Sequence, residues 1–266
     1  MYMKKGISTY FGFVYDPEQR YENIKNVGFD YVMTCTDTRF DWQNGTLEEQ
    51  CAMFDKLGIK RDSLHSTYTT GTLPLFWQEG QAGEDILNGL IDDVKLCAKY
   101  NFKCLVVHLI GDITQVGFER FKKLISIAEQ NNVVLAIENL DVNIELLEFL
   151  FNNISSPSLR FCFDSGHEHC FNYDGTLEKF GKYLVCLHLH DNAGIEDDHT
   201  LNKYGTIDWD NMAKRLASIP HIEDVVLNYE LLMNYKSEDD NSETVLKECY
   251  KQACDLEKAI NKYLNK

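Results

Sequence analysis

The stretch Val133-Val134-Leu135-Ala136-Ile137-Glu138-Asn139 contains five consecutive apolar residues followed by a carboxylate and an amide. A strand that is apolar on both faces is typical of a parallel sheet that other elements cover on both sides. The run Leu105-Val106-Val107 has the same character and is followed by His108. The two runs therefore predict a buried parallel sheet whose strands end in polar side chains.

Eight β-rich runs of this kind alternate with amphipathic helical patterns from one end of the chain to the other. The predicted strands are Gly6–Phe11, Tyr31–Thr34, Ser63–Ser66, Cys104–His108, Val133–Glu138, Arg160–Phe163, Val185–His188 and Val225–Glu230. The predicted helices are Pro17–Val27, Thr46–Leu57, Glu84–Tyr100, Phe118–Gln130, Ile144–Phe151, Leu177–Tyr183, Asp210–Leu216 and Ser242–Leu264.

Eight repeating units of roughly 30 residues favour a closed (β/α)8 TIM barrel. The competing architecture is a doubly wound open sheet, but no GxGxxG motif opens the first βα turn. The sequence also has no linker, low-complexity stretch or break in composition. We therefore expect residues 1–266 to form a single α/β domain with the (β/α)8 topology.

The charge balance argues against two classes of partner. The chain carries 26 basic and 42 acidic residues, for a net charge of −16. A strongly negative surface repels nucleic acid backbones and anionic lipid, so neither is an expected partner. Association with further copies of the same chain is left open by the sequence.

The cysteines and the N-terminal residues indicate a reducing cytoplasm. The nine cysteines are an odd number without a CxxC pair, and Cys104, Cys162 and Cys186 lie inside apolar strand runs. Buried thiols of this kind pack as small hydrophobic groups. No signal-peptide core or transmembrane run is visible, and we expect a cytoplasmic protein.

Six of the eight predicted strands end in a histidine or a carboxylate. These residues are His65, His108, Glu138, Asp164, His188 and Glu230. A single histidine is more often structural than a ligand, but the carboxyl ends of barrel strands are where active sites lie. Burying so many ionisable groups together is unfavourable without a cation. The pattern therefore predicts a metal site at the mouth of the barrel.

The series resembles the xylose isomerase-like TIM barrel superfamily, which holds sugar and sugar phosphate isomerases and epimerases and also endonuclease IV. The resemblance covers nearly the whole chain. The segments that carry it are Ala136–Asn139, Phe161–His167, Leu187–Asp191, Asp197–His199, Gly205–Trp209 and Tyr229–Glu230.

The resemblance implies a core metal held by Glu138, Asp164, His188 and Glu230. It also implies further ligands of the endonuclease branch at His65, His108, His167, Asp197 and His199. All nine positions are filled in this sequence. The sequence departs from the family pattern in the loop Thr200–Gly205, where relatives often carry a turn rich in proline and glycine. This difference puts the identity of the substrate in doubt more than the binding of metal.

Three carboxylates and one imidazole suit Mn²⁺ or Zn²⁺, and also Mg²⁺ or Co²⁺. In the resembling epimerases two glutamates act on opposite faces of the sugar, which implies that Glu138 and Glu230 form the acid–base pair. The expected reaction moves a proton through an enediolate and isomerises or epimerises a sugar or sugar phosphate. The residues expected to contact this carbohydrate are His167, His190, Trp42 and Trp77. His190 has the alternative role of orienting a metal ligand.

Two other functions remain open at this stage. The complete ligand set also fits a zinc-dependent hydrolase of abasic DNA similar to endonuclease IV, although the net charge of −16 gives little sign of a DNA track. A metal-binding barrel without activity is disfavoured because both glutamates are present. Whether the carbohydrate is phosphorylated is not decided, since no glycine-rich phosphate loop is visible.

Overall fold

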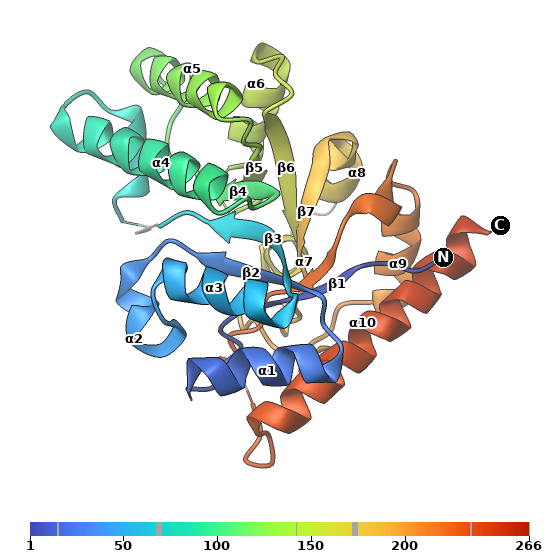
Figure 1. Cartoon of the computed structure of the whole chain (residues 1–266). Coiled ribbons are helices and arrows are strands. Elements are labelled where there is room, and N and C mark those ends of the chain that lie inside the picture. The colour runs from blue at the N-terminus through green and yellow to red at the C-terminus, as the bar shows by residue number, and fades with distance from the viewer. Residues whose placement is uncertain (15, 68–70, 142, 172–174, 235, 266) are drawn as a thin grey trace.

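The eight predicted strands all form, and they make one parallel sheet. The computed structural model describes residues 1–14, 16–67, 71–141, 143–171, 175–234 and 236–265. Its strands follow the order β7-β6-β5-β4-β3-β2-β1-β8, with the helices around them (Figure 1). The strands are β1 (Lys5–Ser8), β2 (Tyr31–Cys35), β3 (Lys60–His65), β4 (Cys104–Val107), β5 (Leu135–Glu138), β6 (Leu159–Asp164), β7 (Leu184–His188) and β8 (Leu227–Tyr229).

The sheet closes between its two outer strands through Leu189, the residue after β7. The backbone N–H of Leu189 donates a hydrogen bond of 2.8 Å to the carbonyl of Asn228, and its carbonyl accepts one of 3.0 Å from Glu230. Leu189 also forms a parallel bridge with Tyr229. The prediction of a single-domain (β/α)8 barrel is therefore confirmed.

The predicted helices are also present, with shifts of a few residues at most ends. The helices are α1 (Pro17–Val27), α2 (Asp41–Asn44), α3 (Leu47–Leu57), α4 (Gln81–Lys99), α5 (Gln115–Gln130), α6 (Ile144–Asn153), α7 (Ser165–Cys170), α8 (Thr176–Phe180), α9 (Trp209–Ala217) and α10 (Ser242–Leu264). Short 3₁₀ turns accompany several of them. The sequence did not predict α2 or α7, because each is too short to show a helical period.

Local capping explains why the two best-predicted helices begin where they do. The side chain of Asp16 accepts a hydrogen bond of 3.2 Å from the backbone N–H of Gln19, and Pro17 occupies the first turn of α1. At α10, the side chain of Asn241 accepts from the backbone N–H groups of Glu243 and Thr244. These interactions satisfy N–H groups that have no partner inside a helix.

The barrel interior is apolar below a polar mouth. Both β4 and β5 are buried along their whole length, as their continuous apolar sequences predict. Cys104, Cys162 and Cys186 lie together inside the barrel, and all nine cysteines of the chain are free thiols. The prediction that these thiols pack as core residues is confirmed. Within the described residues, no helix is both long and apolar enough to cross a membrane.

Candidate metal centre

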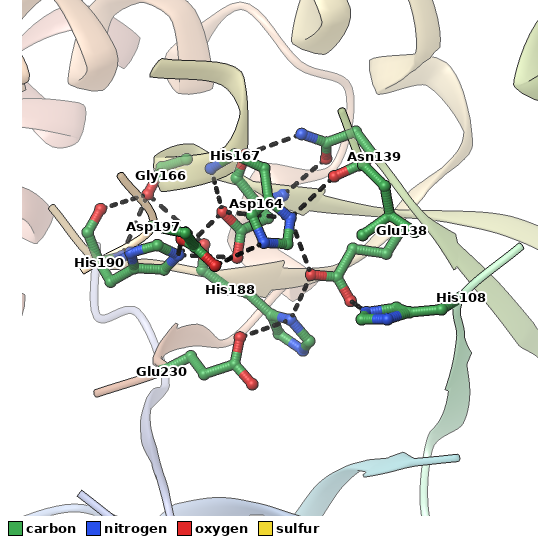
Figure 2. A network of polar contacts seen from close by, with 12 residues as sticks. His108, Glu138, Asn139, Asp164, Gly166, His167, His188, His190, Asp197 and Glu230 are labelled. Carbon is green, nitrogen blue, oxygen red and sulfur yellow. Dashed lines mark hydrogen bonds and ion pairs between the residues drawn. The ribbon is translucent and has the colours of Figure 1, made fainter. Parts of the chain in front are cut away.

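Four residues from neighbouring strand ends converge at the centre of the mouth. Glu138 ends β5, Asp164 ends β6, His188 ends β7 and Glu230 follows β8. The Nδ1 atom of His188 lies 3.1 Å from Oε1 of Glu138 and 3.1 Å from Oε2 of Glu230 (Figure 2). One potential ligand atom from each of the four lies within 4.8 Å of the others. The geometry suits a single divalent ion with oxygen and nitrogen ligands.

A second cluster shares Glu138 with the first. The Nε2 atom of His108 lies 3.0 Å from Oε2 of Glu138 and 3.2 Å from Nε2 of His65. The Nδ1–H group of His65 donates to the carbonyl of Ser66 at 2.9 Å, so its Nε2 faces the cluster with a lone pair. A cation between these nitrogens and the carboxylate would satisfy all three groups.

A third cluster lies around Asp197. His167 donates from Nδ1 to the carbonyl of Asn139 at 2.9 Å, and His199 donates from Nδ1 to the carbonyl of Glu230 at 3.1 Å. Both rings therefore direct Nε2 at Oδ2 of Asp197, at 3.2 Å and 2.8 Å. Protons can bridge these nitrogens to the carboxylate, and a metal ion that replaced the protons would have two imidazoles and one carboxylate as ligands.

The pKa shifts at the mouth favour negatively charged carboxylates next to positively charged imidazoles. Burial raises the pKa of Glu138 and Glu230, but the charge of His188 outweighs it, so that the first lies well below its ordinary value and the second at about 2. Burial lowers the pKa of His199, yet its hydrogen bond to Asp197 raises it to about 9. The carboxylates are thus anionic and lie beside imidazoles that carry a proton and a positive charge. A divalent ion that replaced the imidazole protons would be attracted by the same carboxylates.

Asn139 fixes the position of a carboxylate that the sequence predicted as a ligand. Its side-chain amide donates to the carbonyl of Asp164 at 2.9 Å and accepts from the backbone N–H of Asp164 at 2.8 Å. Oδ1 of Asp164 in turn accepts the backbone N–H of His167 at 2.7 Å and caps α7. The role of Asn139 was not predicted. Its position directly after Glu138, at the end of a strand, is the feature of the sequence from which a place at the mouth could have been predicted.

The nine predicted metal ligands all lie in these three clusters. Eight of them are buried or nearly so, and the side chain of Asp197 is the most exposed at 30%. That they bind metal remains a prediction, now supported by their common location. His169, on α7 outside the three clusters, forms a hydrogen bond of 2.8 Å between its Nε2 and the hydroxyl of Thr206.

The residues predicted to contact substrate are placed very differently. His167 lies in the third cluster, and His190 is fully buried with Nε2 at 3.0 Å and 3.1 Å from the two oxygens of Asp164. Of its two expected roles, this position favours contact with a ligand residue over contact with substrate.

The expectation for Trp77 is corrected. It is only 1% exposed, and a Cβ atom on Gly117 would lie 2.3 Å from its ring, so it packs inside the protein against a helix backbone. Trp42 is 72% exposed on α2 and is not among the residues that line the cavity described next.

A cavity of about 260 Å³ opens beside the first two clusters. Its surface is largely apolar, from side chains such as Met33, Phe40 and Leu232, and hydroxyl, amide and carboxylate groups are set into it. The lining residues are Ser8, Thr9, Tyr10, Met33, Thr34, Cys35, Asp37, Phe40, Asn44, His65, Ser66, Glu230, Leu232 and Asn234. Because His65 and Glu230 belong to this lining, a small polar molecule in the cavity would lie against the candidate metal centre.

Comparison with known families agrees with this architecture. The model of the xylose isomerase-like TIM barrel matches residues 21–247. The chain belongs to the xylose isomerase-like TIM barrel family. Proteins with sequence similarity include the uncharacterized protein y4fM of Sinorhizobium fredii, 29% identical over 180 residues that cover 60% of this chain and 54% of that protein. Another is the uncharacterized protein MJ1311 of Methanocaldococcus jannaschii, 24% identical over 147 residues, 47% of this chain and 50% of that protein. The chain thus spans about half the length of the curated relatives it matches.

Solved structures of the family share the fold over nearly the whole chain. A D-tagatose 3-epimerase-like protein has a TM-score of 0.78 at 18% identity, covering 98% of this chain and 99% of its own. The IolI protein with a bound zinc atom has a TM-score of 0.73 at 20% identity, with the same coverage. D-psicose 3-epimerase from Clostridium cellulolyticum H10, solved with D-tagatose, has a TM-score of 0.67 at 17% identity, covering 99% of this chain and 97% of its own. Sugar epimerases are therefore among the structural neighbours of this fold.

Proposed function

We propose that this protein is a divalent-metal-dependent isomerase or epimerase that acts on a small carbohydrate. The observation that carries the proposal is that two carboxylates, the buried Glu138 and the mostly buried Glu230, flank the same imidazole nitrogen of His188 at 3.1 Å each. Family membership and the presence of sugar epimerases among the structural neighbours support it.

The proposed metal ligands at the centre are Glu138, Asp164, His188 and Glu230. Their three carboxylates and one imidazole fit Mn²⁺ or Zn²⁺. A bound ion of this kind polarises a substrate carbonyl and stabilises the negative charge that develops when a proton leaves the adjacent carbon.

The two glutamates of the chain would move the proton. Both have a pKa held low by His188, so each is a carboxylate at neutral pH and able to accept a proton. They come from β5 and from the end of β8, so they reach the centre from different parts of the mouth. One glutamate would remove the proton and the other would return it. Return to the same carbon gives an epimer, and return to the neighbouring carbon gives the isomer.

The cavity beside His65 and Glu230 is the proposed substrate site. Its hydroxyl and amide groups, such as those of Ser66 and Asn234, are suited to the hydroxyls of a sugar, and Phe40 offers an apolar surface. The polar wall would orient the carbohydrate so that one carbon faces the two glutamates.

The second candidate is a zinc-dependent hydrolase of abasic DNA, and the three adjacent clusters favour it, because grouped metal ions suit phosphodiester cleavage. The net charge of −16 weighs against binding a DNA backbone. We rank it below the carbohydrate reaction for this reason.

The test is a set of aldoses and ketoses, free and phosphorylated, incubated in D₂O with the protein and Mn²⁺ or Zn²⁺. We expect deuterium to enter the carbon next to a carbonyl of at least one sugar, together with formation of an isomer or epimer. A protein that leaves every sugar unlabelled but cleaves a duplex with an abasic site would reverse the ranking of the two functions.

A further inference from the structure

A third imidazole approaches Asp197 beside those of His167 and His199. The Nε2 atom of His190 lies 3.6 Å from Oδ1 of Asp197, and this Oδ1 is a buried oxygen without a hydrogen-bond partner in the described structure. The ring of His190 is fully buried and lies beside Asp197 in Figure 2. A buried carboxylate oxygen and a buried imidazole nitrogen thus face each other at a distance longer than a hydrogen bond.

The backbone of α7 is shaped to admit this ring. A Cβ atom on Gly166 would lie 1.9 Å from Cε1 of His190 and 2.4 Å from its Nδ1, so only glycine fits here. Nδ1 has no hydrogen-bond partner, and it is the ring edge next to Gly166. The ring also stacks on His199, with centroids 3.8 Å apart and planes at 15°. These contacts leave Nε2 as the nitrogen that faces the cluster.

We propose that His190 supplies the fourth protein ligand, through Nε2, to a metal ion held by His167, Asp197 and His199. One ligand atom from each of the four lies within 4.8 Å of the others. Three imidazoles and one carboxylate form the donor set of a tetrahedral zinc site. The inference rests on the proposed metal site at Asp197 but not on the proposed reaction.

A fourth protein ligand changes what this ion does. Structural zinc sites are closed by four protein ligands, whereas catalytic sites keep one position for water or substrate. The ion at Asp197 is therefore structural: it fastens the loop that carries Asp197 and His199 to α7 and to the end of β7. It has no open position for a phosphodiester or a sugar oxygen, which leaves the chemistry to the two clusters that share Glu138.

The alternative is that Nε2 of His190 carries a proton and donates it to Asp164, whose oxygens lie at 3.0 Å and 3.1 Å. A crystal structure of the zinc-loaded protein, with anomalous data at the zinc edge, separates the two roles. We expect an ion with Nε2 of His190 at about 2.0–2.1 Å. An ion whose fourth ligand is water, with His190 still bonded to Asp164, would overturn the proposal, as would the absence of an ion at Asp197.

A solution test uses the double variant Glu138→Ala/His188→Ala, because every other group of potential metal ligands among the described residues contains Glu138 or His188. In this background we expect His190→Gln to lower the zinc affinity by more than the roughly 10- to 100-fold that loss of a hydrogen-bond partner of a ligand costs. Gly166→Ala should weaken zinc binding in the same direction by displacing the ring. His169→Gln, the same change on α7 outside the cluster, should leave the affinity unaltered.

His199→Ala in the same background separates the possible failures. If it does not weaken zinc binding, the metal site at Asp197 is itself wrong, and the proposal falls with it. If it abolishes binding while His190→Gln keeps wild-type affinity, the site stands and the assignment of His190 is wrong. Neither result depends on whether the protein turns over a sugar.

Discussion

At the scale of single residues, backbone carbonyls decide which ring nitrogen of each histidine faces the mouth. His65, His167 and His199 each donate Nδ1–H to a carbonyl, which turns Nε2 inward. His188 is reversed, with Nδ1 between the two glutamates and Nε2 on the side of Cys186. The rings are thus oriented before any ion arrives, so little reorganisation opposes metal binding.

Replacing Glu138 or Glu230 with glutamine tests the proposed acid–base pair. Glutamine keeps the size and one ligating oxygen but cannot take a proton at neutral pH. We expect each variant to lose about 10²–10⁴ in turnover while still binding the central ion. Steady-state kinetics and metal content should be measured on the same preparations. Near-normal turnover in a fully loaded variant would remove that glutamate from the pair.

Asp62, on β3 below the mouth, makes stability depend on pH. Burial raises its pKa to about 8, so between pH 4 and pH 8 the folded state keeps a proton that the unfolded state has released. This group therefore destabilises the protein progressively as pH rises through that range. We expect Asp62→Asn to gain on the order of a few kcal/mol over the wild type between pH 4 and pH 8, measured by urea unfolding.

The matched control is Asp92→Asn, which removes the same charge from an exposed ion pair with Lys95. Its unfolding free energy should run nearly parallel to that of the wild type across the same pH range. If Asp62→Asn also runs parallel, Asp62 is ionised in the folded protein and its burial does not control the pH dependence.

At the scale of elements, the last helix is joined to the first strand. α10 buries one face against the barrel, including Val245, Cys249 and Leu256. Lys5 of β1 forms an ion pair of 2.6 Å with Glu257 of α10, and their side chains are only 2% and 15% exposed. Glu257 also accepts the backbone N–H of Met3 at 2.6 Å. The charged helix predicted from the sequence is therefore an integral part of the fold.

Removing the charge of Glu257 leaves Lys5 buried without its anionic partner. We expect Glu257→Gln to lower the free energy of unfolding by about 3–5 kcal/mol. Asp255→Asn, in an exposed pair with Lys251 on the same helix, should cost about 0–1 kcal/mol. Equal effects of the two substitutions on chemical denaturation would show that the contact between β1 and α10 contributes no more than a surface pair.

At the scale of the whole molecule, the barrel gathers side chains from six strands onto one mouth. The chain carries a net charge of −16, and carboxylates and imidazoles meet there in three clusters. Divalent ions would relieve the repulsion among the carboxylates, and they bind the folded state only, because the ligands are far apart in the unfolded chain.

Metal should therefore stabilise the entire fold. At a free ion concentration of 100 times Kd, each site adds about 2.7 kcal/mol to the free energy of unfolding. We expect the Tm to rise when Zn²⁺ or Mn²⁺ is added to protein stripped with EDTA, and to rise less in Asp164→Asn. An identical Tm in EDTA and in excess metal would contradict metal binding at the mouth.

The barrel and the positions of its polar strand ends could be predicted from the order of residues alone. Continuous apolar runs specify strands buried on both faces, and local caps specify where α1 and α10 begin, since both signals depend only on neighbouring residues. In a closed parallel barrel every strand points the same way, so a residue at the end of one strand must lie near the ends of the others. The predicted ligands at the strand ends, such as Glu138 and Glu230, therefore lie close together in the structure, as expected.

Which side chains lie inside, and which nitrogen faces which oxygen, could not be predicted before the folded structure was known. Trp77 belongs to a loop that the sequence placed at the mouth, yet the missing side chains of Gly111 and Gly117 make room for it in the interior. His190 is set against Asp164 and Asp197 because Gly166, 24 positions earlier in the sequence, leaves space for its ring. Such packing depends on the shapes of segments far apart in the chain. Neither the hydrophobic periodicity nor the amino-acid composition of a sequence predicts it.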